Sequence, residues 1–290
     1  MMKNPAKRRQ AIALYDRFTH EGMDRRELIT RMTAIAGSAA AAELLIAGIA
    51  PSAAAAAVVP PDHPRLTTRI LEFEDPRGVY GYLAEPRTRS LKPTVMVIHE
   101  NRGLNDHIRD VARRLALAGY RAFAPDFLAP SGGTPANADA AREAIGKIDL
   151  ALATQSAVAM LGELAKASRG GKVGAVGFCW GGAFVNRLAV TAGGALAAGV
   201  SYYGPAPAPA EASKVQAPLM IHLAGLDERV NRTAFPWVEA LRAAGKAVTY
   251  HGYDGVNHAF HNDTSAERFD RTAAELSWRR TLRFFHRHLG

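Results

Sequence analysis

The sequence predicts an α/β protein with a doubly wound, mostly parallel sheet that is covered by helices on both faces. Short apolar segments alternate with longer segments of helical periodicity along most of the chain. The apolar segments are hydrophobic throughout rather than at every second residue, which is typical of parallel strands buried on both faces. Functional sites in such sheets lie beyond the carboxyl ends of the strands. The loops that follow the strands are therefore expected to build the site.

The elements are expected in a simple order after a linker that contains Pro60, Pro61 and Pro64. Segments 69–74 and 79–83, separated by Asp75-Pro76-Arg77-Gly78, predict an N-terminal β-hairpin. Parallel strands are expected at 94–98, 121–124, 172–178, 197–202, 218–223 and 248–253. Helices are expected near 106–118, 138–168, 180–192, 233–245 and 268–288.

Composition excludes several classes of function. The 290 residues are 48% hydrophobic and 22% charged, as in an ordinary globular chain with one main domain. Of the net charge of +9, residues 1–57 contribute +3, with eight Lys or Arg against five Asp or Glu. The other basic residues are scattered among acids, which argues against nucleic-acid binding. A single cysteine excludes an internal disulfide and a cysteine-rich metal site.

The hexapeptide Gly177-Phe178-Cys179-Trp180-Gly181-Gly182 places that cysteine in a G-x-C-x-G turn directly after an apolar strand segment. Glycines flank a nucleophile at such a turn because a sharp strand-to-helix bend leaves no room for side chains beside it. This is the nucleophile position of the α/β-hydrolase fold, with a thiol where serine is usual. The alternative is a small apolar cysteine that fills core space. The motif favours Cys179 as a catalytic nucleophile.

Chain order selects the partners of the nucleophile, because α/β-hydrolases run nucleophile, acid, histidine. Asp227 follows the strand segment 218–223, and His258 lies in a small-residue loop after 248–253. A thiol is mostly protonated at neutral pH and needs a base, and the histidine needs a carboxylate to orient it. Glu228 and Asp254 are rival acids, and a surface Asp227 or a structural His258 is the alternative. The order favours a Cys179, His258 and Asp227 triad.

An oxyanion formed at this turn needs two N–H donors. The backbone N–H of Trp180, at the start of the following helix, is one expected donor. The second is expected from the loop His99-Glu100-Asn101-Arg102-Gly103, with the backbone N–H of Asn101 as the choice.

Several motifs together resemble the dienelactone hydrolase (carboxymethylenebutenolidase) family over about residues 65–289. They are the cysteine turn at 177–182, His99-Glu100-Asn101-Arg102-Gly103-Leu104-Asn105, Ala118-Gly119-Tyr120 with Pro125-Asp126, Tyr202-Tyr203-Gly204, and Gly255-Val256-Asn257-His258-Ala259-Phe260. The resemblance implies opening of an enol lactone through an acyl-enzyme on the cysteine. It also implies that Glu100 contacts the resting cysteine and helps to activate it. Read without the family, Glu100 could simply cap or brace its loop.

The same resemblance implies substrate-binding residues. The family prototype holds a substrate carboxylate with two arginines, and Arg142 lies in a stretch similar to the region of one of them. Asn262 stands where the prototype has the other, which puts a chlorocatechol-pathway dienelactone in doubt. Arg142 on a solvated helix face is the alternative. Tyr203 and Arg102 are further expected to line the substrate site.

Residues 1–57 are predicted to be a leader. Asp24-Arg25-Arg26-Glu27-Leu28-Ile29 precedes a mildly apolar, alanine-rich stretch, which resembles a twin-arginine export signal, and the run 53–57 supplies small residues for a signal peptidase. Glu43 departs from the simplest pattern. An uncleaved amphipathic helix and a membrane anchor are the alternatives, although a spanning helix needs about 20 strongly apolar residues. We expect a leader over 1–57, a catalytic domain over 58–290, and a periplasmic or secreted product of the twin-arginine machinery.

The sequence thus predicts an exported cysteine hydrolase that acts on a small lactone or activated carboxylic ester. A general carboxylesterase is the near alternative, and a thiol-redox protein or a non-catalytic protein on the same fold is the distant one. A redox role usually needs a resolving thiol, which the chain lacks. No dinucleotide, phosphate-loop or metal-ligand motif is present, so neither a cofactor nor a metal is expected.

Overall fold

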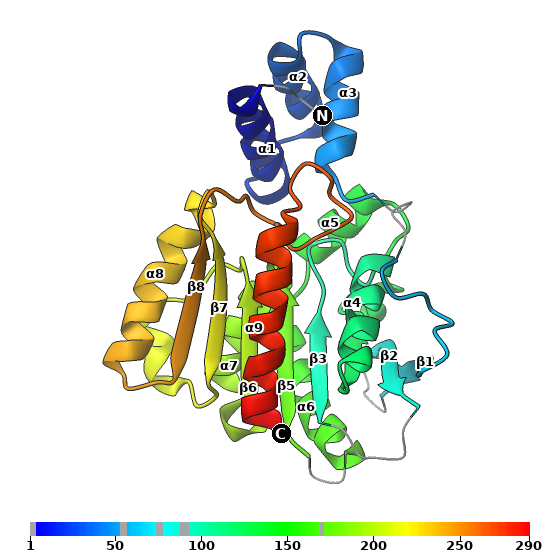
Figure 1. Ribbon diagram of the computed structural model, residues 1–290, viewed down its shortest axis with the longest axis vertical. Helices are drawn as coiled ribbons and strands as arrows, with labels where there is room; N and C mark the ends of the chain where they lie inside the picture. The colour runs from blue at the N-terminus through cyan, green and yellow to red at the C-terminus, as the bar shows by residue number, and fades with distance from the viewer. Residues whose placement is uncertain (1–3, 53–56, 74–77, 88–92, 169–170) are drawn as a thin grey trace.

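The computed structural model describes residues 4–52, 57–73, 78–87, 93–168 and 171–290. One eight-stranded sheet runs through the molecule in the order β1-β2-β4-β3-β5-β6-β7-β8, and the last six strands of that order are parallel (Figure 1). The strands are β1 (Leu66–Glu72), β2 (Tyr80–Pro86), β3 (Thr94–Ile98), β4 (Arg121–Pro125), β5 (Val173–Phe178), β6 (Ala198–Tyr202), β7 (Leu219–Ala224) and β8 (Val248–Tyr253). The predicted α/β-hydrolase fold class, with its mostly parallel sheet, is confirmed.

The predicted N-terminal hairpin forms the antiparallel edge of this sheet. Strand β1 pairs antiparallel with β2, from Leu66 opposite Pro86 to Glu72 opposite Tyr80. Strand β2 then pairs antiparallel with β4 and so joins the hairpin to the parallel strands. Of the predicted turn, residues 75–77 lie outside the described part of the chain.

Helices cover both faces of the sheet, as expected. They are α4 (Asp106–Leu117), α5 (Ala138–Gly146), α6 (Leu150–Ala167), α7 (Trp180–Thr191), α8 (Glu228–Ala243) and α9 (Arg271–Leu289). Alternate residues of β3 point to opposite faces, as the pleat requires. Val95 and Val97 share a core with α4 and α9, while Met96 and Ile98 share one with α6, α7 and α8. This double burial explains why the strand sequences are apolar throughout.

Two predicted helices differ from the structure at positions where an aspartate caps a helix. The single helix expected over 138–168 is divided into α5 and α6, and Asp149 begins α6 by accepting the N–H groups of Ala151 and Leu152. Helix α8 begins at Glu228 rather than near 233, because the Asp227 carboxylate accepts the N–H of Val230. Side-chain caps of this kind fix helix starts that hydrophobic periodicity alone does not mark.

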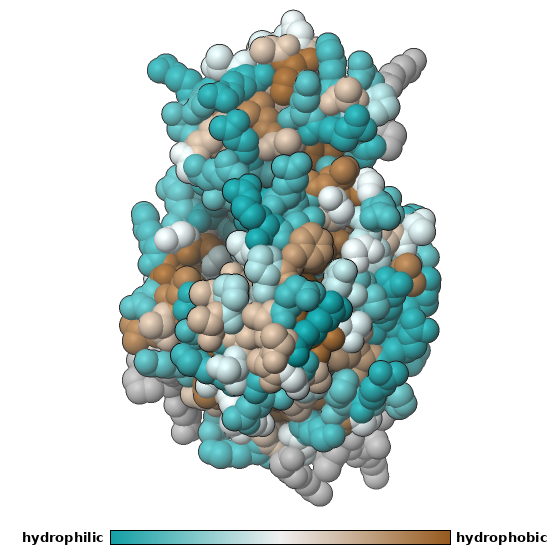
Figure 2. Space-filling view, turned by 90° about the vertical axis from the view of Figure 1, so that its left-hand side faces the viewer, coloured by the Kyte–Doolittle hydropathy of each residue, from teal (hydrophilic) through white to brown (hydrophobic). Residues whose placement is uncertain are grey.

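The N-terminal segment is folded into three helices, α1 (Pro5–His20), α2 (Arg25–Ala36) and α3 (Ala39–Ile49). They have a small core of their own, which includes Ile12, Phe18, Leu28, Met32 and Leu45. In Figure 1 they stand above the edge of the sheet where the parallel strands end, and in Figure 2 they form a lobe narrower than the domain beneath it. The run 53–57 that was expected to meet a signal peptidase lies, for residues 53–56, outside the described part of the chain.

Among the described residues, no single helix is long and apolar enough to cross a membrane. Two pairs of consecutive helices, α2 with α3 and α5 with α6, reach the length and hydropathy of a membrane span only when the two helices of a pair are counted together. Each pair is sharply bent between its helices.

Candidate active site

Cys179 occupies a tight turn between β5 and α7. Its backbone has φ 55° and ψ −111°, in the positive-φ region that non-glycine residues rarely adopt. The turn is closely packed on its flanks, since a Cβ on Gly177 would lie 2.0 Å from the carbonyl oxygen of Gly181. A Cβ on Gly181 would lie 2.3 Å from the carbonyl oxygen of Ile98. These glycines therefore have no substitute without movement of the backbone, as the sequence motif predicts for a nucleophile turn.

Asp227 and His258 form a buried pair beyond the ends of β7 and β8. The Nδ1 atom of His258 lies 2.5 Å from Oδ2 of Asp227, and both side chains are about 95% buried or more. The other carboxylate oxygen of Asp227 accepts the N–H of Val230 and caps α8. The rival acids Glu228 and Asp254 are both exposed. The structure therefore brings His258 together with the acid that chain order selects.

The pair is polarised by its surroundings. Burial opposes the charged form of His258, but the neighbouring Asp227 carboxylate and Cys179 outweigh it and raise the pKa of His258 to about 10. Burial likewise opposes ionisation of Asp227, yet the His258 ring and its hydrogen bond lower the pKa of Asp227. Asp227 thus stabilises the imidazolium that forms when His258 accepts a proton, which makes His258 a stronger base.

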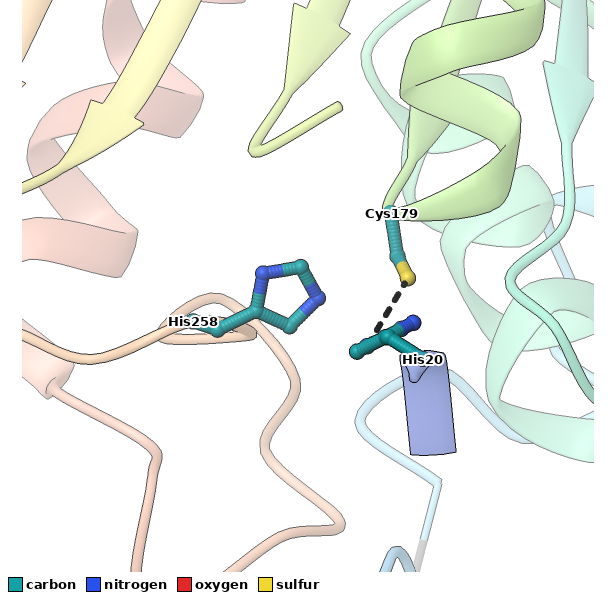
Figure 3. Close-up of side chains that lie close together, drawn as sticks. All are labelled: His20, Cys179 and His258. Atoms are coloured by element: carbon teal, nitrogen blue, oxygen red, sulfur yellow. Dashed lines mark hydrogen bonds between the residues drawn. The ribbon is translucent and has the colours of Figure 1, made fainter. Parts of the chain in front are cut away.

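The sulfur of Cys179 faces His258 and a second histidine, His20, which ends α1 (Figure 3). Donor atoms of the three residues all lie within 4.8 Å of one another. The sulfur lies 3.9 Å from Nε2 of His20. The Nε2 atom of His258 is buried and has no hydrogen-bond partner among the described residues. Because Nδ1 is held by Asp227, this free nitrogen is the one available to exchange a proton with the thiol or a substrate.

The donor atoms of His20, Cys179 and His258 are also close enough together to hold a metal ion.

The two residues expected to supply oxyanion donors adjoin Cys179: Trp180 follows it in sequence, and Asn101 lines the same cavity. Trp180 is the first residue of α7, so its backbone N–H has no acceptor within the helix. Asn101 follows β3 and lines the cavity around Cys179, and its side-chain amide donates to the carbonyl of Thr19 at 3.4 Å. The Trp180 ring stacks on His99 with the ring centroids 5.2 Å apart, which fixes the start of α7 against the β3 loop.

Glu100 is buried at the same cavity but is engaged with another partner. Its Oε2 atom accepts a hydrogen bond from the side-chain amide of Asn262 at 2.7 Å. The partner that the structure gives the Cys179 sulfur is His20 instead. Asn262, which stands where the family prototype is expected to have an arginine, therefore orients Glu100.

The three expected substrate-binding residues have different positions. Arg102 lines the cavity, and its guanidinium donates to the hydroxyl of Tyr15 on α1. The Tyr203 ring is fully buried, packs 5.0 Å from the His258 ring and has a backbone φ of 37°. Arg142 is not among the residues that line the cavity; its guanidinium lies 4.6 Å from the centre of the Phe18 ring on α1. The structure thus places Arg102 and Tyr203 at the site and Arg142 against the N-terminal helices.

Sequence reasoning missed three residues of the site. His20 and Asp16 come from the segment interpreted as a leader, and Arg268 lies in the loop after His258. Arg268 is 6% exposed and pairs with Asp16 at 3.1 Å. Nothing in the local pattern around these residues distinguishes them from surface charges. Only the contact between the two distant segments identifies them.

The cavity at Cys179 has a volume of only about 20 Å³. That is space for about one water molecule. Its lining comes from the catalytic domain and from the N-terminal segment: Thr19, His20, Pro51, Glu100, Asn101, Arg102, Cys179, His258, Ala259 and Arg268.

The chain is similar in sequence to known proteins. The model of the dienelactone hydrolase family matches residues 79–289. A provisionally named carboxymethylenebutenolidase from Methylorubrum extorquens is 31% identical over 225 residues, which cover 72% of this chain and 76% of that protein. A protein named usf from Aquifex pyrophilus is 31% identical over 76% of this chain and 99% of its own length.

Solved structures agree. A provisionally named dienelactone hydrolase from Klebsiella pneumoniae superposes with a TM-score of 0.67 at 25% identity, covering 76% of this chain and 99% of that one. A dienelactone hydrolase-like promiscuous phosphotriesterase from metagenomic libraries gives the same TM-score and identity, covering 78% of this chain and all of its own. By the family match and these relatives, the chain belongs to the dienelactone hydrolase family and is a carboxylic ester hydrolase.

Proposed function

We propose that the protein opens a small lactone, or cleaves an activated carboxylic ester, through a thioester on Cys179. The observation that carries this proposal is the buried Asp227–His258 pair, whose free Nε2 lies in the same cavity as a cysteine on a strained turn. A merely structural cysteine needs neither the strain nor the polarised histidine.

The reaction follows from the position of each group. His258 Nε2 accepts the thiol proton, and the thiolate sulfur attacks the carbonyl carbon of the ester. The backbone N–H groups of Trp180 and Asn101 stabilise the negative oxygen of the tetrahedral intermediate. The bond from carbon to the leaving oxygen then breaks, and His258 gives its proton to that oxygen, which restores the neutral imidazole. Water, deprotonated by His258, hydrolyses the thioester and restores the thiol.

A negatively charged substrate suits this site. Arg268 and Arg102 both line the cavity, and Arg268 already binds the carboxylate of Asp16. A guanidinium recognises a carboxylate through its fixed fork of N–H donors. A lactone that carries a carboxylate would therefore find its partner in Arg268, and Glu100 would act through its position beside the thiol. The resemblance to the family prototype implies Arg142 as the residue that binds the substrate carboxylate, so the proposed role of Arg268 differs from that expectation.

The assignment is tested by turnover of p-nitrophenyl acetate and of a dienelactone in protein freed of residues 1–57, comparing the otherwise wild-type chain with Cys179→Ala and His258→Ala. Both variants should lose turnover of both substrates. Equal turnover in the three proteins would remove Cys179 and His258 from the mechanism. Hydrolysis of p-nitrophenyl acetate without any opening of the dienelactone would favour a general carboxylesterase.

The N-terminal segment is proposed to be a twin-arginine export leader as well as a folded unit. The arginine pair begins α2, and the Arg25 side chain is 64% exposed although it contacts Asp139. An exposed pair is accessible to an export receptor that accepts folded proteins. Sequencing of the N-terminus of periplasmic or secreted protein tests the idea, because an intact Met1 would contradict removal of the leader.

A further inference from the structure

The N-terminal helices and the catalytic cavity share an interface that the fold does not require. The family match covers residues 79–289, so α1, α2 and α3 lie outside it. These helices stand over the ends of the parallel strands, where the sheet builds its site (Figure 1). Many of their apolar side chains are already buried in a core of their own. Their contacts with the site therefore need a separate explanation.

The end of α1 fills the site. His20 approaches the Cys179 sulfur to 3.9 Å and packs edge to face on the His258 ring, with the ring centroids 5.0 Å apart (Figure 3). The carbonyl of Thr19 accepts from the Asn101 side chain, beside the expected oxyanion position. The remaining cavity of about 20 Å³ is too small for any ester substrate, since one water needs about 10–15 Å³.

Polar contacts hold α1 in this position. The Asp16 carboxylate pairs with the buried Arg268 at 3.1 Å, and the Tyr15 hydroxyl accepts from Arg102. Asp16 thus occupies the guanidinium group that would otherwise receive a substrate carboxylate. Near the N-terminal end of α1, Arg8 pairs with Glu267 at 2.7 Å.

A second set of contacts anchors the end of α3 to the same loop. Ser265 donates its hydroxyl to the carbonyl of Ile49 at 2.6 Å, and the N–H of Glu267 donates to the carbonyl of Gly48 at 3.0 Å. The loop that follows His258 is therefore held by both ends of the helical unit.

We infer that residues 4–52 are an internal inhibitor of the hydrolase, a plug that occupies the acyl site and its anion-binding arginine until it moves or is removed. The inference rests on the proposed function, because it takes Cys179 as the nucleophile. It adds a consequence to the export proposal: removal of the leader would also open the active site.

Alkylation of the thiol measures the plug directly, because Cys179 is the only cysteine of the chain. The second-order rate with iodoacetamide is compared in full-length wild type, Asp16→Asn, Arg8→Gln and Glu21→Gln. Glu21, the C-cap residue of α1, is exposed and pairs with the exposed Arg17 of the same helix, so its acid-to-amide change is the matched control. Arg8 lies at the end of α1 opposite His20, away from the thiol. A change in alkylation rate in Arg8→Gln therefore reflects movement of the plug and not a changed charge near the sulfur.

Removing the Asp16 carboxylate should speed alkylation by about tenfold or more, because the substitution leaves the buried Arg268 without its partner only while the plug is closed. Arg8→Gln should speed it by a smaller factor, and Glu21→Gln should leave it unchanged. A protease site that replaces residues 53–57 in the full chain provides a second measurement. Cleavage and removal of the N-terminal piece should raise the rate more than either substitution.

Wild-type alkylation as fast as that of the cleaved protein, or Asp16→Asn and Arg8→Gln rates equal to the control rate, would overturn the inference. Ester turnover separates it from the proposed function. A cleaved protein with a fast-reacting thiol and no ester turnover would contradict the proposed function and leave the plug intact. Full turnover in the uncleaved wild type would contradict the plug and leave the proposed function intact.

Discussion

Asp227 performs two tasks whose energies can be separated by substitution. One carboxylate oxygen holds His258 Nδ1 at 2.5 Å, and the other caps α8 through the N–H of Val230 at 3.1 Å. Asparagine is as good a helix cap as aspartate, but it lacks the charge that balances an imidazolium. Alanine lacks both. Comparison of Asp227→Asn with Asp227→Ala therefore isolates the cap.

The magnitudes follow from burial. Removing one partner of a buried charged pair costs about 3–5 kcal/mol of the free energy of unfolding, so Asp227→Ala should lose at least that much. Asp227→Asn should be more stable than Asp227→Ala by about 1 kcal/mol, the usual value of an N-cap. Turnover should fall in both variants by roughly 10³–10⁴-fold, because either change removes the group that orients the histidine.

Urea unfolding followed by tryptophan fluorescence gives the stabilities, since Trp180, Trp237 and Trp278 all lie in the catalytic domain. Turnover of p-nitrophenyl acetate, measured after cleavage of the N-terminal segment, gives the activities. Equal stability of Asp227→Asn and Asp227→Ala would refute a stabilising role of Asp227 as the N-cap of α8. Activity within tenfold of wild type in both would refute the role of Asp227 in orienting His258.

Three further predictions follow from the site. Because the pKa of His258 is raised from 6.5 to about 10 in the folded protein, its stabilising effect is complete below pH 6.5 and is lost as the pH rises to about 10. Between these pH values the free energy of unfolding of wild type should fall by as much as about 5 kcal/mol more than that of His258→Gln, and equal slopes in urea titrations would contradict this. Cys179→Ser should stay folded and lose kcat/KM by on the order of a hundredfold in ester assays, because the base is suited to a thiol; full activity would show that the thiol is dispensable. In the cleaved protein, Arg268→Gln should raise KM by roughly tenfold to a hundredfold for a lactone with a carboxylate, and leave KM unchanged for a neutral ester. Equal effects on both substrates would exclude carboxylate recognition.

The sheet and the order of the site residues could be predicted because they depend on local pattern. Strand β8 matches its expected bounds of 248–253, and β3 matches 94–98. Asp227 was distinguished from Glu228 and Asp254 only by chain order and by the loop that holds it, yet it is the acid that contacts His258. The fold class determines the chain order and the loops in which such site residues occur, and the alternation of apolar and helical segments indicates the fold class.

The contacts between distant segments could not be predicted in the same way. Helical periodicity runs without interruption across 138–168, so the break before Asp149 depends on a cap and on packing rather than on hydrophobic pattern. The segment before residue 57 has the composition of a leader, and nothing in that composition indicates that His20 reaches Cys179. The pair of Asp16 with Arg268 joins residues 252 positions apart, which only the tertiary structure brings together.

In the proposed mechanism, Cys179 carries the acyl group during turnover. Rapid quenching of the cleaved protein with p-nitrophenyl acetate, followed by mass spectrometry of its peptides, measures that acyl group directly. We predict one acetyl group on the peptide that contains Cys179, released by hydroxylamine as a thioester is. Turnover that proceeds with the acetyl group on another residue, or undiminished turnover in Cys179→Ala, would contradict it.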